Sequence, residues 1–61
     1  MKDMQVHLEK LRTDAAECIL ISDKTDDPEK RQLFAMMAQH LTVLADEVQR
    51  EIDRKLGQDG A

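Results

Sequence analysis

The sequence predicts an all-α fold, an antiparallel two-helix hairpin that dimerises into a four-helix bundle. Apolar residues recur three or four positions apart in two long stretches, which is the period of an amphipathic helix. One polar break, which contains the chain's single proline, Pro28, separates the two stretches. The second stretch also carries more apolar residues than one neighbouring helix can cover, and this surplus predicts a second copy of the chain.

The first helix is expected over residues 3–23. Its seam, the narrow stripe facing the other helix, is predicted to hold Met1, Met4, Leu8, Leu11, Ala15 and Cys18. Residues 18–21 are all apolar and encircle the helix for about one turn. A lone hairpin would leave part of this ring in water.

The polar segment 22–29 is predicted to be a capped turn. Pro28 suits the first position of a helix, where its missing N–H is no loss, and Asp27 is placed to cap it. Asp26 with Glu29 forms an alternative capping box. So short a connection makes the helices antiparallel.

The same acidic segment could instead be interpreted as a calcium loop. Four residues alternate as the first ligands of an EF-hand do, namely Asp23, Thr25, Asp27 and Glu29. However, Pro28 stands where such a loop needs glycine, and Phe34 stands where it needs glutamate. A capped turn is therefore the better interpretation.

The second helix is expected over residues 28–56, with Gly57 as the residue that ends it. The hairpin would then span residues 1–57, followed by a disordered tail at 58–61. One apolar stripe comprises Phe34, Met37, Leu41, Leu44, Val48 and, after a slip of one position, Ile52. A second, adjacent stripe comprises Leu33, Met36, His40 and Val43. Two adjacent stripes indicate two neighbouring helices.

The position of the turn predicts the register of the hairpin. Residue numbers that face each other should add to about 50 or 51, so Ile52 and Leu56 should extend beyond the first helix. A homodimer would cover this overhang together with the second stripe and the apolar ring. The predicted interface with a second copy, or with another protein's helix, is Leu33, Phe34, Met36, Met37, His40, Leu41, Val43, Leu44, Val48, Ile52, Leu56, Cys18, Ile19 and Ile21.

Charge and composition limit the possible functions. The net charge of −4 repels nucleic acid and anionic lipid. No stretch approaches the roughly 20 apolar residues of a membrane span, and a single cysteine fits a reducing compartment. We therefore expect a cytoplasmic protein.

No residues are arranged as a catalytic, metal or cofactor site. His7 and His40 lack clustered ligands, so His40 is expected at the interface, where its protonation in acid would weaken assembly. Cys18 is interpreted as a small buried apolar residue. We expect no enzymatic activity and no cofactor.

Two resemblances concern architecture. The segments Ala15-Ala16-Glu17-Cys18 and Asp27-Pro28-Glu29-Lys30-Arg31 resemble those of short, uncharacterised bacterial proteins, and this resemblance implies a helical hairpin without a stated activity. The C-terminal residues Ala45-Asp46-Glu47-Val48 are similar to those of the Rop-type dimeric hairpin, which binds RNA.

The leading hypothesis is therefore a homodimeric protein-interaction or small regulatory module. A Rop-like nucleic-acid regulator is the alternative, using basic residues expected to gather at the open end of the hairpin: Lys2, Arg50, Arg54 and Lys55. A stand-alone bundle that binds only itself is a further alternative.

Overall fold

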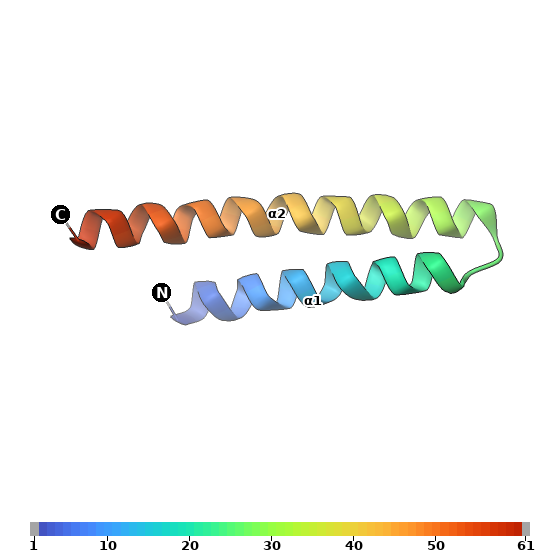
Figure 1. Ribbon diagram of the computed structural model, residues 1–61, viewed down its shortest axis with the longest axis horizontal. Coiled ribbons are helices and arrows are strands. Elements are labelled where there is room, and N and C mark those ends of the chain that lie inside the picture. Colours follow the sequence, from blue (N-terminus) through green and yellow to red (C-terminus); the bar gives the residue numbers. More distant parts are fainter. Residues whose placement is uncertain (1, 61) are drawn as a thin grey trace.

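The computed structural model describes the backbone of residues 2–60 and the side chains of residues 2–57. It consists of two α-helices, α1 (Lys2–Lys24) and α2 (Pro28–Gly60), joined by a turn at residues 25–27. The helices run antiparallel side by side and make a single layer (Figure 1). The predicted all-α hairpin is confirmed. The hairpin measures 51 × 15 × 11 Å, the dimensions of two helices side by side. Each helix is therefore covered by the other on one side only.

Asp27 caps the start of α2. Its side-chain Oδ1 accepts a hydrogen bond from the backbone N–H of Glu29 at 3.0 Å. Its backbone carbonyl accepts the bond that opens the helix, from the N–H of Arg31 at 2.9 Å. Asp27 is thus the N-cap and Pro28 the first helical residue, as the sequence predicted. The Arg31 guanidinium also donates to the carbonyl of Thr25 at 3.0 Å, which ties the turn to the helix.

The predicted end of α2 is wrong. The helix passes through Gly57 and continues to Gly60, and Gly57 lacks the positive φ of a residue that terminates a helix. A glycine inside a helix costs about 1 kcal/mol relative to alanine, which weakens a helix without ending it. The backbone of the predicted tail is therefore helical at residues 58–60, while its side chains and Ala61 lie outside the described residues.

The two helices meet along a seam of twelve buried or half-buried residues. Those of α1 are Met4, Leu8, Leu11, Ala15, Cys18 and Ser22. Those of α2 are Phe34, Ala38, Leu41, Ala45, Val48 and Ile52. On both helices the intervals alternate between four and three, the heptad spacing of packed helices. The predicted α1 seam is confirmed from Met4 onward, and Met1 lies outside the described residues.

The first apolar stripe predicted for α2 differs from the observed seam at two positions. Ala38 and Ala45 occupy the places assigned to Met37 and Leu44, which are 42% and 47% exposed. The alternation of four and three runs from Phe34 to Ile52 without the predicted slip. Alanine at these positions allows the two backbones to approach closely, whereas the larger side chains are turned toward solvent.

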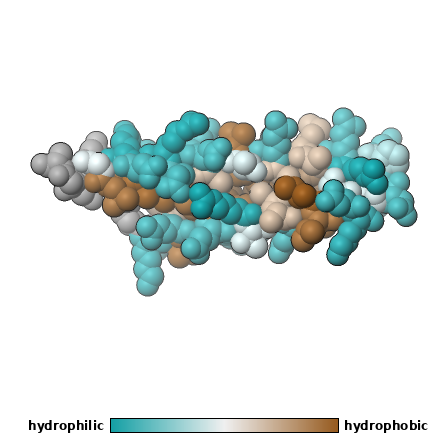
Figure 2. Space-filling model, viewed as in Figure 1, coloured by the Kyte–Doolittle hydropathy of each residue, from teal (hydrophilic) through white to brown (hydrophobic). Residues whose placement is uncertain are grey.

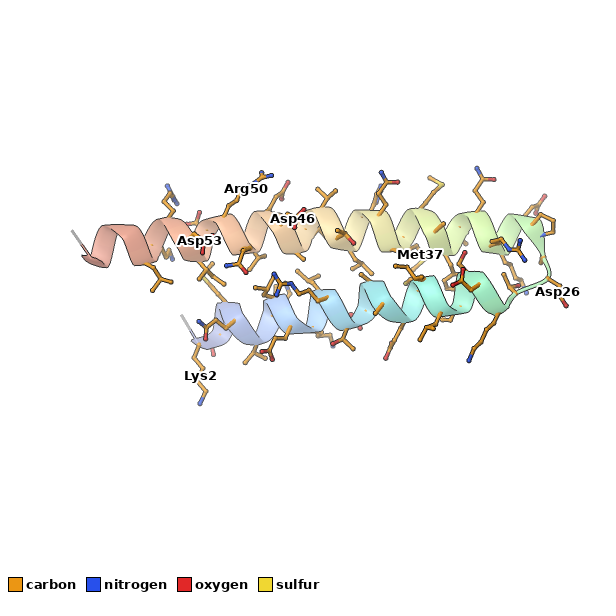
Figure 3. All side chains as sticks on the ribbon, in the orientation of Figure 1. Lys2, Asp26, Met37, Asp46, Arg50 and Asp53 are labelled. Carbon is orange, nitrogen blue, oxygen red and sulfur yellow. The ribbon has the colours of Figure 1, made fainter. Side chains whose placement is uncertain are left out.

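Ile52 was predicted to extend beyond α1, and this prediction is wrong. It is 2% exposed and packs in one cluster with Leu8, Leu11 and Ala45. Figure 3 agrees, because Lys2 and Asp53 lie at the same level along the hairpin. Taken in antiparallel order, the seam residues pair as Met4 with Ile52, Leu8 with Val48, Leu11 with Ala45, Ala15 with Leu41, Cys18 with Ala38 and Ser22 with Phe34.

The direction of the side chains explains this register. Side chains on a helix lean toward its N-terminus, so those of α1 lean away from the turn and those of α2 lean toward it. The side chain of an α2 residue therefore contacts an α1 residue that is closer to the turn than the residue directly opposite its own backbone. Leu56, one turn beyond Ile52, does remain 53% exposed, as expected.

Candidate assembly surface

Large apolar side chains lie on the outside of the hairpin, and most of them are near the turn. We call residues 15–44 the turn half, and the remaining described residues the open half. Among the described side chains, the large apolar residues exposed in the turn half are Ile19, Leu20, Ile21, Leu33, Met36, Met37, Val43 and Leu44. Those exposed in the open half are Val6 and Leu56. Figure 2 shows one face of the hairpin, with brown and tan surface toward the turn half and a further brown stripe in the open half.

The buried residues have the opposite distribution. The fully buried residues of the turn half are all small: Ala15, Cys18, Ser22 and Ala38. Those of the open half include three large side chains, Leu8, Leu11 and Ile52. Its large seam residues, Phe34 and Leu41, are half-buried, so the turn half buries less apolar volume within the chain than the open half and exposes more. This exposed apolar surface is therefore the candidate surface for an interaction.

One line of exposed residues runs along α2 beside the seam. It consists of Lys30, Leu33, Met37, His40, Leu44 and Glu47, and we call it the outer line. From Leu33 on, each member stands one residue before a seam residue, so the line lies about 100° around the helix from the seam. All six residues are exposed, and Met36 and Val43 flank the apolar centre of the line. The outer line presents a second helical contact face.

The residues predicted for the interface fall into two groups. Nine are exposed and available to a partner: Leu33, Met36, Met37, His40, Val43, Leu44, Leu56, Ile19 and Ile21. Five belong to the seam within the chain: Cys18, Phe34, Leu41, Val48 and Ile52. Cys18 and Ile52 are already buried within the chain, so the hairpin does not expose them to a partner. Conversely, the prediction omitted exposed Leu20, which the apolar run at 18–21 would have supplied.

A groove with a volume of about 430 Å³ lies on the turn half, and sequence reasoning missed it. Its lining is Ile19, Ser22, Asp23, Ala35, Ala38, Gln39, Thr42 and Val43. The Ser22 hydroxyl donates to the carbonyl of Arg31 at 2.9 Å, and the Thr42 hydroxyl donates to that of Ala38 at 2.8 Å. Both hydroxyls are therefore used within the chain, which leaves the groove mainly apolar. The sequence feature that could have predicted this groove is the set of small residues at 35, 38 and 42, which are spaced three and four apart.

The open half carries a polar connection between the helices. The Arg12 guanidinium donates to Gln49 Oε1 at 3.1 Å, and Gln49 Nε2 donates to Asp53 Oδ1 at 3.0 Å. Arg54 pairs with Glu51, and its hydrogen bond lowers the pKa of the Glu51 carboxyl below its ordinary value. These polar contacts thus lie in the half of the hairpin that buries most of its large apolar residues.

Two of the basic residues expected at the open end do not lie on one face. Lys2 points away from α2, and Arg50 points away from α1, so their charges lie on opposite sides of the hairpin (Figure 3). Arg54 is paired with Glu51. A phosphate backbone would need these charges on one face, because its binding depends on several cations acting together.

The chain matches no family model, no curated protein and no solved structure with which it was compared. Within the described part of the chain, no three His, Cys, Asp or Glu side chains lie close enough to hold a metal ion. Neither helix, over its described residues, has a segment apolar and long enough to cross a membrane.

Proposed function

We propose that this hairpin is a self-associating interaction module, in which two copies pack into a four-helix bundle and catalysis plays no part. The exposed apolar surface of the turn half carries the proposal. Its eight large side chains are each about half exposed, and they come from both helices. No element of the chain's described part is left to cover them, because α1 and α2 already contact each other along the seam.

The energetics favour association of moderate strength. Covering the exposed half of a large apolar side chain contributes on the order of 1 kcal/mol. Most of the eight side chains on each of two copies would together contribute on the order of 10 kcal/mol, against an association cost of about 4–15 kcal/mol. With a cost at the low end of this range, the net free energy of association is about −6 kcal/mol, which corresponds to a Kd of tens of micromolar.

The arrangement of charge favours this proposal over a nucleic-acid regulator. The chain is acidic overall, and Lys2 and Arg50 point in opposite directions. Retention of the protein on RNA at physiological salt would reverse this preference.

Sedimentation equilibrium over a concentration series tests the proposal. We expect the wild-type chain to dimerise and Leu44→Glu, which places a charge within the exposed apolar surface, to remain monomeric at the same concentrations. Val6→Glu is the matched control, because Val6 is 59% exposed but lies in the open half, away from the proposed contact. A wild-type chain that stays monomeric up to about 1 mM would contradict the proposal.

A further inference from the structure

We infer that the two copies meet through their α2 helices in antiparallel orientation, with the two-fold axis passing between Met37 and His40. This inference rests on the proposed self-association and specifies its geometry. It follows from the order of residues along the outer line, which has the same spacing when traced from either end and carries opposite charges at its two ends.

The outer line has heptad spacing over its whole length. Its six residues are separated by three, four, three, four and three positions, which is a symmetric series. Such spacing keeps one face of a helix against one partner helix. From Lys30 to Glu47 the line extends about 26 Å along α2, enough for a continuous helix–helix contact.

An antiparallel match pairs residues of compatible chemistry at every level. With the axis between Met37 and His40, the three pairs are Lys30 with Glu47 of the second copy, Leu33 with Leu44 of the second copy, and Met37 with His40 of the second copy. Symmetry repeats each pair on the other side of the axis. The centre of the contact is thus mainly apolar, and each end carries a lysine opposite a glutamate.

A parallel match pairs like charges instead. Lys30 would face Lys30 of the second copy, and Glu47 would face Glu47 of the second copy. Exposed pairs contribute little individually, but repulsion at both ends of a parallel contact and attraction at both ends of an antiparallel contact act in the same direction. Charge complementarity therefore selects the antiparallel dimer.

The division of the hairpin into halves agrees with this geometry. An axis between Met37 and His40 overlaps the turn halves of the two copies and sends their open halves in opposite directions. The overlapping halves carry the eight exposed large apolar residues, and the open halves carry the polar connection from Arg12 to Asp53. A second copy in this position covers the apolar residues of the outer line and leaves the polar connection in water.

Disulfide trapping tests the orientation. In a Cys18→Ala background, Leu33→Cys and Leu44→Cys are oxidised with diamide, each alone and as a mixture. The two copies of residue 33 lie roughly 16 Å apart along an antiparallel contact, beyond the reach of a disulfide, whereas residue 33 lies level with residue 44 of the second copy. We expect the mixture to form mixed disulfide dimers at least tenfold faster than either variant alone, with Val6→Cys giving the collisional rate.

Rapid trapping of Leu33→Cys with itself, and slow trapping of the mixture, would overturn the antiparallel orientation while leaving the proposed function intact. A wild-type chain that is monomeric in sedimentation would overturn both the orientation and the proposed self-association. The surface would then be available to another protein's helix instead.

Exchanging the charges at the ends of the line provides an independent test that leaves the apolar residues in place. We expect Lys30→Glu and Glu47→Lys each to raise the dimer Kd by roughly three- to tenfold, because each creates like-charged pairs. The double variant should return the Kd to within about twofold of wild type. Single variants with an unchanged Kd would contradict the antiparallel pairing, since a parallel contact keeps like charges in all three variants.

Discussion

The two halves of the hairpin use their apolar residues in opposite ways. The open half places leucine and isoleucine in the seam, where Leu8, Leu11 and Ile52 form the buried cluster. The turn half places alanine, cysteine and serine at its most buried positions and directs most of its large side chains outward. One heptad pattern runs through both halves, so the difference lies in which residues occupy it.

This comparison separates two tasks that a short chain must perform. Residues buried in the open half hold α1 against α2 in one register, and the Arg12–Gln49 hydrogen bond supports that register. The small residues of the turn half let the helices approach, but they bury little apolar area and stabilise the hairpin less. A domain of this size is marginal on its own, so covering the outer surface of the turn half would add stability where the seam supplies least.

The largest expected effect comes from removing a buried side chain of the open half. We expect Ile52→Ala to lower the free energy of unfolding by about 2–4 kcal/mol, because it removes apolar contacts and leaves a cavity in the buried cluster. Urea denaturation followed by circular dichroism measures the loss. Leu56→Ala is the control, since Leu56 lies one turn away and is exposed. Equal losses for the two variants would show that the open half has no special role in holding the hairpin.

A smaller effect is expected from enlarging a residue in the seam of the turn half. Ala38→Leu should cost about 1–3 kcal/mol of stability, because Ala38 is buried at the level of Cys18, where the helices approach closely. Ala35→Leu tests the same change at an exposed position one turn away. If Ala38→Leu instead stabilised the hairpin, the seam of the turn half would be underpacked rather than closely packed.

The smallest effect concerns the polar surface of the open half. Arg54 lowers the pKa of Glu51, so the ionised carboxylate is favoured in the folded state and its contribution to stability is present at neutral pH. This contribution is lost as the pH falls through the lowered pKa of the folded state. We expect Glu51→Gln to unfold at a slightly lower temperature than wild type at pH 7, and the difference to vanish in acid. A difference that grows in acid would contradict this assignment.

The sequence predicted the helices, the capped turn and the α1 seam, because each depends on local pattern. Asp27 and Pro28 specify the start of α2 through a hydrogen bond and a fixed backbone angle, and both act over a few residues. The sequence also predicted an exposed second stripe on α2, since a helix with two apolar faces needs two neighbours. The end of α2 was wrong because one glycine weakens a helix without terminating it.

The register and the choice of seam residues on α2 could not be predicted in this way. Met37 and Leu44 are more apolar and larger than Ala38 and Ala45, so hydrophobicity alone assigns them to the seam. Close approach of two helices favours the smaller residues, and the lean of side chains in opposite directions shifts the register that brings Ile52 against α1. Which apolar residues stay buried, and which remain for a partner, is therefore decided by the contact between the helices. The sequence by itself determined that two helices form and that they carry more apolar residues than their mutual contact can bury. The tertiary structure decided that most of these remaining residues lie on the outer surface of the turn half, because the small residues there occupy the seam.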